Sequence, residues 1–368
     1  MIKCLFLMNN LGGGGAERVL VNLVNHMDDT RFDITIQTVF PAGQNKSSLS
    51  KNIKLVEGKM RECRGISRLF KYMPKRIASA FYQKDNYDIA IAYLHGVPTK
   101  ILWDYNGKKI AWLHDDMEHS SLSKCFFNNQ ISKCFDSYDR IVGVSDTVCD
   151  SFARLYGLKE KLLTIYNTND TKDILIKSNE EQRLFEWSSY KGTKLISIGN
   201  LREQKGYDRL IRVCKKIKNG GLDFSLLILG DGNQKEMLKK MIADNNLSET
   251  IELGGFISNP YPYIKQADLF VCSSRFEGLS TVMTESLILG TPIITTEVSG
   301  SRETLGNNEY GVIVENSEDG LYDGLKCLLE NPDRIEYYRE KAKERAQLFD
   351  TRATVKAVED LIQEVVDE

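Results

Sequence analysis

The sequence predicts an α/β protein made of two doubly wound domains, each with a parallel sheet between layers of helices. The chain has 368 residues, more than one hydrophobic core usually supports, so two domains of about 150 to 200 residues each are expected. Apolar runs typical of strands alternate with helical patterns from one end to the other, as in repeated βα units. A polar, irregular stretch near the middle interrupts this alternation and divides the chain in two.

The composition is that of an ordinary globular protein. Hydrophobic residues make up 42% of the chain and charged residues 27%, which excludes long disorder and fibrous repeats. The net charge of -2 gives no reason to expect a nucleic-acid partner. The eight cysteines are scattered without a C-x-x-C pair or a Cys/His cluster, so neither zinc nor a disulfide framework is expected. No apolar run reaches about 18 residues, and the first residues read as a strand and not as a signal peptide, so we expect a cytoplasmic protein.

The expected strands fall into two sets of six. The first domain, residues 1–169, should contain Ile2–Met8, Phe32–Phe40, Asp88–Tyr93, Lys109–Leu113, Arg140–Val144 and Leu162–Tyr166. Residues 170–192 form the polar stretch and are expected to be a linker. The second domain, residues 193–349, should contain Leu195–Ile198, Phe224–Leu229, Thr250–Leu253, Leu269–Ser273, Pro292–Thr295 and Gly311–Val314. Helices are expected at Pro332–Phe349 and Arg352–Val366, and Asp350-Thr351 between them is a plausible N-cap, so residues 350–368 are expected to form a separate C-terminal helix.

Doubly wound sheets bind ligands at the carboxyl ends of their strands, and the first such loop is rich in glycine. Leu11–Arg18 reads LGGGGAER and precedes a helix, so the amides near Gly14 and Gly15 can approach a phosphate. A G-x-G-x-x-G frame fails in this loop, and the second strand offers no acidic residue for a ribose, so a nicotinamide site is disfavoured. A flexible turn before a helix is the alternative interpretation.

The segment Arg275–Thr296 carries the strongest signal. From Gly278 to Thr296 the only charged residue is Glu285, in a sequence that otherwise reads as a buried helix and a buried strand, so its carboxylate needs partners. Glu277 lies eight positions earlier, before the helix, where the first N–H groups could hold an anion. The alternative is an acidic residue that favours the helix dipole plus one solvated glutamate.

This Glu-x7-Glu pattern resembles the signature of the retaining GT-B glycosyltransferases of family GT4, the group 1 transferases, and the resemblance covers nearly the whole chain. It implies two facing Rossmann-like domains, with the acceptor bound by the N-terminal one, the nucleotide-sugar bound by the C-terminal one, and the last helix returning to the N-terminal domain. Glu285 would hold the ribose hydroxyls and Glu277 would contact the donor sugar. The amides that would face the diphosphate are those of Gly278, Leu279 and Ser280.

A second matching segment, Ile196–Ile211, contains Arg202 and Lys205 after a strand. When the sugar leaves, negative charge grows on the diphosphate, and in the absence of a metal it must be met by fixed cations and amides. The family pattern usually begins Gly-Arg-Leu, whereas here Asn200 follows the glycine, which leaves open whether Arg202 replaces the missing arginine. The alternative for both basic residues is a solvated loop.

Two more loops match the family. Leu253–Ser258 resembles the loop that lines the base, with backbone contacts at Phe256 and Ile257. Ala111–Asp116 puts His114 at a strand end, where the resemblance implies a contact with the transferred sugar and the acceptor. A lone histidine is more often structural, and His95 is the spare candidate.

The resemblance implies a transfer on one face of the sugar, in which a donor phosphate oxygen accepts the acceptor's proton. Glu277 is therefore not assigned as a nucleophile; orientation and stabilisation of the diphosphate should supply most of the rate. No Asp-x-Asp motif lies in a strand-end loop, so we expect no metal and no other cofactor.

The stretch Lys59–Phe81 is basic and amphipathic. Five basic residues recur every three or four positions, namely Arg61, Arg64, Arg68, Lys71 and Lys75, and apolar residues recur two positions later. A helix that covers the sheet with a solvated cationic face explains this pattern, and Pro74 interrupts it. The sharper hypothesis is peripheral contact with an anionic membrane on its inner face, where a lipid-linked acceptor would be met.

Taken with the resemblance, these motifs predict a retaining, metal-independent glycosyltransferase. It would move a hexose or related sugar from a nucleotide-sugar, with a UDP-sugar as first candidate, to a lipid-linked or surface-polysaccharide intermediate. The alternative is a catalytically inactive, nucleotide-sugar-binding partner of a transferase complex, which Asn200 favours and the retained Glu277, Glu285 and Lys205 oppose. An epimerase or a phosphorylase of the same architecture is a third reading. The sequence leaves open the donor sugar, the base, the acceptor and the oligomeric state.

Overall fold

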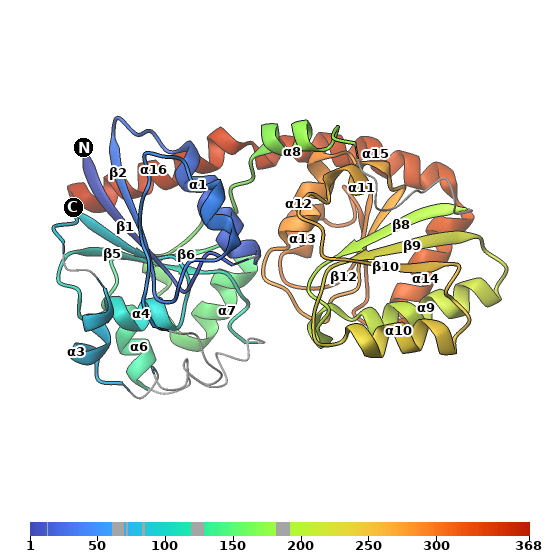
Figure 1. Cartoon of the computed structure of the whole chain (residues 1–368), viewed down its shortest axis with the longest axis horizontal. Coiled ribbons are helices and arrows are strands. Elements are labelled where there is room, and N and C mark those ends of the chain that lie inside the picture. Colours follow the sequence, from blue (N-terminus) through green and yellow to red (C-terminus); the bar gives the residue numbers. More distant parts are fainter. Residues whose placement is uncertain (13, 61–69, 71–72, 83–84, 119–128, 182–191) are drawn as a thin grey trace. The chain divides into compact units, whose positions relative to one another are not determined.

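The computed structural model describes the whole chain except residues 13, 61–69, 71–72, 83–84, 119–128 and 182–191 (Figure 1). The described residues form two compact units. One consists of Met1–Asn169 together with Thr351–Glu368, and the other of Asp170–Asp350. Each unit is an α/β domain with one parallel sheet, which confirms the predicted fold class.

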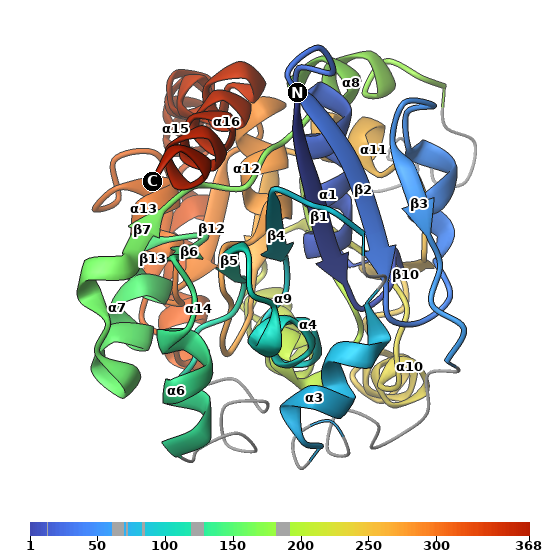
Figure 2. The ribbon, with the colours of Figure 1, turned by 90° about the vertical axis from the view of Figure 1, so that its left-hand side faces the viewer.

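The N-terminal unit contains a seven-stranded parallel sheet in the order β3-β2-β1-β4-β5-β6-β7 (Figure 2). Its strands are β1 (Ile2–Met8), β2 (Phe32–Thr38), β3 (Lys54–Val56), β4 (Ile89–Ala92), β5 (Lys108–Leu113), β6 (Arg140–Gly143) and β7 (Leu162–Thr164). Its helices include α1 (Gly15–His26), α3 (Lys75–Ala78), α4 (Val97–Ile101), α6 (Asn129–Asp136), α7 (Asp146–Tyr156) and α16 (Thr351–Asp367).

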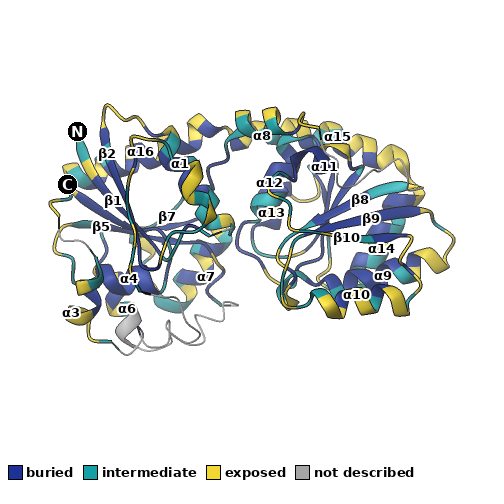
Figure 3. Cartoon of the chain, in the orientation of Figure 1, coloured by how far each residue is buried: buried dark blue, intermediate teal, exposed yellow. Residues whose placement is uncertain are grey.

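The central strands of this sheet are buried on both faces, which explains why they read as continuous apolar runs (Figure 3). All residues from Cys4 to Met8 in β1 are fully buried. Strand β3 was not expected, because it has only three residues and begins with the exposed Lys54 at the sheet edge. Such a short strand is too brief to show a hydrophobic period.

The C-terminal unit contains a six-stranded parallel sheet in the order β10-β9-β8-β11-β12-β13. The strands are β8 (Thr193–Ile198), β9 (Phe224–Leu229), β10 (Ile251–Gly255), β11 (Leu269–Cys272), β12 (Ile293–Thr296) and β13 (Val312–Val314). The helices are α8 (Thr171–Lys177), α9 (Tyr207–Asn219), α10 (Lys235–Asp244), α11 (Tyr261–Gln266), α12 (Thr281–Ile288), α13 (Ser301–Leu305), α14 (Glu318–Glu330) and α15 (Pro332–Ala346).

Alternate residues of these strands enter two separate hydrophobic clusters, one on each face of the sheet. Leu195 and Leu226 belong to the first cluster, whereas Ile196 and Leu227 belong to the second. This is the alternation that a pleated strand imposes, and it requires apolar residues on both faces. The core of the C-terminal unit therefore lies above and below its sheet.

The strand order places a topological switch point beside β8. From β8 the chain winds outward through β9 and β10, and then returns to add β11, β12 and β13 on the other side. Strands β8 and β11 are direct neighbours, with Leu195 paired to Leu269 and Ile196 to Phe270. The loops that follow these two strands consequently begin next to each other, which is where open α/β sheets bind ligands.

Two chain segments belong to units that the sequence only partly indicates, namely residues 170–181 and helix α16. Residues 170–181 fall in the stretch expected to be a linker, yet they include helix α8, whose Ile174 is part of the C-terminal core. Helix α16 is part of the N-terminal unit: the backbone amide of Asp28 donates to a Glu359 carboxylate oxygen at 2.7 Å, and Thr351 Oγ1 donates to the carbonyl of Asn169 at 2.7 Å.

Most of the basic stretch that suggested a membrane surface lies outside the described residues, including Arg61, Arg64, Arg68 and Lys71. Its described end forms α3, where Lys75 pairs with Asp104 at 2.8 Å and Ile77 is 53% exposed. Within the described chain, no helix is both long and apolar enough to cross a membrane. Peripheral contact with a membrane stays a prediction.

Candidate functional site

The loops after β8 and β11 are held against each other at a glycine. The loop after β8 ends in a 3-10 turn, Glu203–Lys205, and Gly206 follows with φ of 65° before α9 begins. A Cβ atom at Gly206 would lie 2.1 Å from the carbonyl oxygen of Ser273, at the end of β11. Only glycine tolerates both the left-handed backbone and this close approach. Gly206 therefore holds the preceding residue, Lys205, beside the end of β11.

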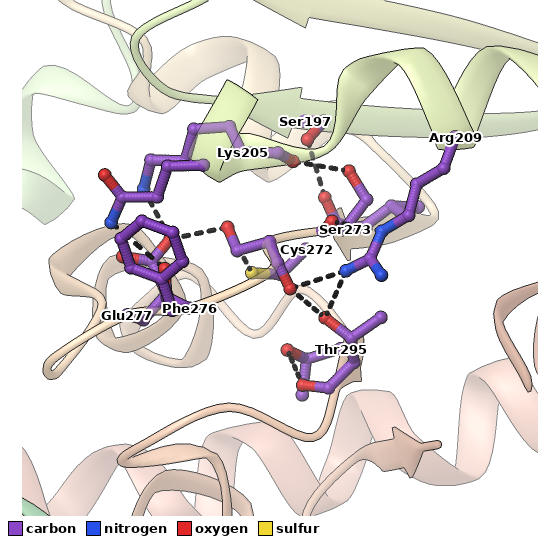
Figure 4. A network of polar contacts seen from close by, with 12 residues as sticks. Ser197, Lys205, Arg209, Cys272, Ser273, Phe276, Glu277 and Thr295 are labelled. Carbon is purple, nitrogen blue, oxygen red and sulfur yellow. Dashed lines mark hydrogen bonds and ion pairs between the residues drawn. The ribbon is translucent and has the colours of Figure 1, made fainter. Parts of the chain in front are cut away.

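Lys205 and Glu277, which are 72 residues apart, form an ion pair in these loops (Figure 4). Lys205 Nζ lies 2.5 Å from Glu277 Oε1, and the hydroxyl of Ser274 donates to the same oxygen at 2.5 Å. Only 8% of the Glu277 side chain is exposed. Burial opposes the charge on Lys205, but the Glu277 carboxylate outweighs it and raises the pKa of the ammonium above its ordinary value. Lys205 is therefore cationic throughout the physiological range.

A buried arginine in the first turn of α9 supports the same two loops. The guanidinium of Arg209 donates to the carbonyls of Ser273 at 2.9 Å and Ser274 at 2.6 Å, and to Thr296 Oγ1 at 3.4 Å. The Thr296 hydroxyl in turn donates to the carbonyl of Ser274 at 2.6 Å. Sequence reasoning missed Arg209; the signal for it was its position on the buried stripe of α9, four residues before Val213.

A second arginine links the loops from the solvent side. Arg275 forms a bidentate pair with Asp208, with both nitrogen–oxygen distances 2.9 Å, and also donates to the carbonyl of Glu203 at 2.7 Å. Burial alone would raise the pKa of Asp208, but the hydrogen bonds and charge of Arg275, with help from Arg212, lower it to about 2. The loop that carries Glu277 is thus tied to α9 on both sides.

The segment that follows Glu277 leads into helix α12. Gly278 and Leu279 are buried, and Ser280 is the N-cap residue of α12 without a side-chain cap among the described residues. Gly300 packs so closely on this turn that a Cβ there would lie 2.7 Å from the Gly278 carbonyl. The N-terminus of α12 brings a partial positive charge beside the Lys205–Glu277 pair.

Glu285 lies in α12 and is 2% exposed, as its place in an apolar segment predicted. The hydroxyl of Tyr261, at the start of α11, donates to Glu285 Oε1 at 3.4 Å. This is a long hydrogen bond, so the carboxylate is only weakly held by that tyrosine. Glu285 therefore lies in α12, and Glu277 lies in the loop directly before this helix.

The other residues predicted for this site are more exposed. Asn200 and Arg202 are exposed in the loop after β8, and among the described residues the side chain of Arg202 forms no ion pair. Strand β10 ends at Gly255, whose φ is 71°, and Phe256 follows it directly. Phe256 is 55% exposed. Ile257 is partly buried against the core. The structure therefore brings Lys205, and not Arg202, onto Glu277.

The remaining predicted residues belong to the N-terminal unit. Gly14 is the N-cap residue of α1 and Gly15 its first residue. His114 directly follows β5 and is 9% exposed, and His95, which is 3% exposed, follows the neighbouring β4.

Burial governs both histidines. It lowers the pKa of His114 to about 3, with the nearby charge of His95 acting in the same direction and a hydrogen bond to the Tyr93 backbone opposing it. Burial also lowers the pKa of His95, although Asp115, 3.9 Å away, opposes this. Both imidazoles are neutral at pH 7 and act as hydrogen-bonding groups, not as cations.

Two family models match this chain, one to each part. The model for glycosyl transferases group 1 matches residues 179–345, and the model for Glycosyltransferase Family 4 matches residues 13–173. The first match lies within the C-terminal unit, and the second lies almost entirely within the N-terminal unit, where neither model reaches α16.

Curated relatives extend this similarity over the whole length. The chain is 28% identical over 366 residues to N-acetylgalactosamine-N,N'-diacetylbacillosaminyl-diphospho-undecaprenol 4-alpha-N-acetylgalactosaminyltransferase of Campylobacter jejuni, covering 95% of this chain and 96% of that protein. It is 24% identical over 303 residues to the lipopolysaccharide core biosynthesis glycosyltransferase LpsE of Rhizobium meliloti, covering 82% of this chain and 81% of the relative.

Solved structures share the fold. Anabaena Alr3699/HepE in complex with UDP and glucose matches with a TM-score of 0.77 at 17% identity, over 99% of this chain and 100% of that one. Sucrose-phosphate synthase from Thermosynechococcus elongatus matches with a TM-score of 0.80 at 16% identity, over 99% of both chains. The fold is therefore GT-B, and with the family models and relatives it defines a glycosyltransferase. More particularly, its two parts match the group 1 and Family 4 models, so the chain is similar to the glycosyltransferases of family GT4.

Proposed function

We propose that this chain is a retaining glycosyltransferase that moves a hexose or related sugar from a UDP-sugar to a glycan carried on a diphospho-lipid. The observation that carries the proposal is the buried Lys205–Glu277 pair beside the N-terminus of α12. It combines, at the switch point of the sheet, a fixed cation, a fixed carboxylate and a helix N-terminus.

The cation and the helix end suit the leaving diphosphate. As the glycosidic bond breaks, negative charge develops on the phosphate oxygens, and preorganised positive groups stabilise it without reorganising. In the proposal Lys205 supplies a full charge, the amides of Gly278, Leu279 and Ser280 supply hydrogen bonds, and Arg202 adds a solvent-exposed cation.

The carboxylate of Glu277 suits the sugar. Lys205 and Ser274 both bind its Oε1, which leaves Oε2 as the oxygen to accept hydrogen bonds from sugar hydroxyls. A carboxylate held by a cation is a weak nucleophile, so we assign Glu277 to orienting the sugar. The proton of the acceptor hydroxyl then passes to a donor phosphate oxygen, and transfer occurs on one face of the sugar.

The nucleotide is assigned to α12 and the loop after β10. Glu285 would accept hydrogen bonds from the ribose hydroxyls. Such hydrogen bonds would offset part of the free-energy cost of removing its carboxylate from water. Phe256 and Ile257 would line the base. The UDP complexes of the HepE structures support a uridine nucleotide.

From the N-terminal unit we propose that His114 contacts the sugar or the acceptor, and that the amides near Gly14 and Gly15 approach a phosphate of the donor. Because its pKa is about 3, His114 is neutral at pH 7 and would donate or accept a hydrogen bond from a hydroxyl of the sugar or acceptor. The Campylobacter relative is named for transfer to a diphospho-undecaprenol-linked sugar, and the Rhizobium relative for lipopolysaccharide core synthesis. Both support a lipid-linked acceptor.

Metal independence is also a proposal. Among the described residues, no three His, Cys, Asp or Glu side chains lie close enough together to hold a metal ion. The cation Lys205 and the α12 amides would do the work that a divalent ion performs in metal-dependent transferases.

The test is calorimetric binding of UDP, GDP and ADP with and without EDTA, followed by hydrolysis of a panel of UDP-sugars. Saturable UDP binding that EDTA leaves unchanged, with release of UDP from one donor, is the expected result. Binding without turnover of any donor, even with a diphospho-lipid acceptor, would instead favour an inactive partner subunit, which the exposed Asn200 in place of the family arginine makes a real alternative. Absence of nucleotide binding would contradict both.

A further inference from the structure

The donor site contains a buried cation that the proposed chemistry does not use. Arg209 is 6% exposed, and its hydrogen-bond acceptors in the described chain are two backbone carbonyls and a hydroxyl, none of them a carboxylate. Burial lowers the pKa of its guanidinium, which is the expected response to a charge removed from water. Burying an arginine whose hydrogen-bond acceptors are all neutral is costly and needs a structural reason.

We propose that Arg209 is a positioning residue, which holds the ends of β11 and β12 so that Ser274 and Lys205 meet one oxygen of Glu277. This inference rests on the proposed function and adds to it a residue outside the set that contacts the donor. Among the described residues, the side chain of Arg209 forms no hydrogen bond with Glu277 or Lys205; it binds backbone carbonyls of the loop after β11 (Figure 4).

The contacts form a continuous path from α9 to the carboxylate. Arg209 fixes the carbonyls of Ser273 and Ser274 with two arms of its planar fork. The Ser274 side chain then donates to Glu277 Oε1, and the Ser273 hydroxyl donates to the carbonyl of Lys205 at 2.9 Å. Both partners of the ion pair are therefore located by the two residues that Arg209 holds.

The end of β12 belongs to the same path. Thr296 Oγ1 donates to the carbonyl of Ser274 while it accepts from Arg209, so the carbonyl receives two hydrogen bonds. The backbone at Gly206 is also close: a Cβ there would lie 2.8 Å from Arg209 Nε. Arg209 thus sits at a junction of three strand-end loops, those after β8, β11 and β12.

Arg275 does not duplicate this role. Its guanidinium forms an ion pair with Asp208 and donates a hydrogen bond to the carbonyl of Glu203, at the solvent side of the loop. The Arg275 side chain is 32% exposed. Its side-chain hydrogen bonds to described residues go to Glu203 and Asp208, and none goes to Ser274. In the proposal, Arg209 holds the carbonyl oxygens of the two peptides on either side of Ser274 and so aims its hydroxyl, and Thr296 adds a hydrogen bond to the second of these carbonyls.

The test is Arg209→Lys, which keeps the positive charge but has a single point donor and cannot span both carbonyls. We expect kcat for UDP-sugar hydrolysis to fall about 10- to 100-fold, because small errors in the placement of reacting groups are costly. The Kd for UDP should change by less than about threefold, since the residues proposed for the ribose and base are not touched.

A matched control exists in the same unit. Arg345 also donates to two backbone carbonyls, those of Glu303 and Thr304, but at the end of α13. Arg345→Lys makes the same chemical change to the same kind of fork and should leave kcat within about twofold of the parent. Equal losses of kcat in both variants would mean that Arg209→Lys acts only by destabilising the unit in general. That result would overturn the proposal.

Two further variants keep the proposal testable if Arg209→Lys fails to fold. Thr296→Val removes one hydrogen bond from the Ser274 carbonyl at nearly constant volume, and should lower kcat severalfold with UDP binding retained. In a Ser274→Ala background, Thr296→Val should cause little additional loss of kcat, because the hydroxyl that it helps to aim is gone. Multiplicative losses in that background would contradict the path through Ser274.

Failure of this inference is distinguishable from failure of the proposed function. If the parent protein neither binds UDP nor releases it from any UDP-sugar, the proposed function is wrong. If the parent does both and Arg209→Lys and Thr296→Val match its kcat, the function stands and Arg209 has no positioning role.

Discussion

Replacing Lys205 by methionine should separate the stability of the proposed donor site from its activity. The variant leaves the Glu277 carboxylate, 8% exposed, with the Ser274 hydroxyl but without its cation. Removing one partner of a buried pair costs about 3–5 kcal/mol. Since 22% of the Lys205 side chain is exposed, solvent screens part of this, and we expect a loss of about 2–3 kcal/mol. For a unit of this size that corresponds to a fall in Tm of roughly 5–10 °C.

A second substitution should restore the stability but not the chemistry. In Lys205→Met/Glu277→Gln no uncompensated charge remains, so most of the loss in Tm should be recovered. The kcat for UDP-sugar hydrolysis should nevertheless stay about 100-fold or more below the parent, as for loss of a preorganised group that meets developing charge. Thermal unfolding by circular dichroism and coupled detection of released UDP measure the two quantities.

The reasoning would be refuted by two results. A double variant with the kcat of the parent would mean that the charges of the pair do not act in catalysis. An unchanged Tm in Lys205→Met would mean that the pair is not buried in solution as the structure describes it.

Three further predictions concern other parts of the chain. Glu285→Ala should weaken UDP binding roughly tenfold through lost hydrogen bonds to the ribose, measured by calorimetry, and an unchanged Kd at an unchanged Tm would remove its ribose role. Because the folded-state pKa of His114, about 3, lies below its ordinary value of 6.5, the unfolded chain takes up this proton first. Its contribution to stability is therefore complete above pH 6.5 and is lost as the pH falls toward 3, so His114→Gln should flatten the acid limb of a urea-unfolding series; a limb of the same slope would show that this residue is not buried neutral. Charge reversal in the basic stretch should reduce sedimentation with anionic vesicles, and sedimentation equal to that of the parent would exclude the membrane hypothesis; the residues to reverse are Arg64, Arg68 and Lys71.

The two sheets could be predicted from sequence because nearly all their strands are apolar on both faces. Predicted and observed strands agree closely at Ile2–Met8 and Phe224–Leu229, and elsewhere the ends differ by one or two residues. Helix α8 was missed, since its seven residues include exposed Leu175 and Ile176 and present no clear apolar stripe. Short elements whose stability comes from tertiary packing leave little trace in a local pattern.

The residues of the candidate donor site could be named from the sequence, but their connections could not. Lys205 and Glu277 could be singled out because each lies in a strand-end loop with a glycine directly after it. That they share one oxygen with Ser274 depends on the side-by-side pairing of β8 and β11, a contact between residues 72 positions apart. For Arg209 the sequence could show only a position on the apolar stripe of α9, because its acceptors are backbone carbonyls, which a sequence does not display.

We propose that the Lys205–Glu277 site transfers a sugar from a UDP-donor with retention of the anomeric configuration. Proton NMR of a UDP-sugar panel, recorded during turnover by the parent protein and by Lys205→Met, tests it most directly. We expect the parent to release UDP from an α-linked donor and to form the α-configured sugar or glycoside first, and we expect Lys205→Met to be about 100-fold slower or inactive. First appearance of the β-configured product, or equal rates for the two proteins, would contradict it.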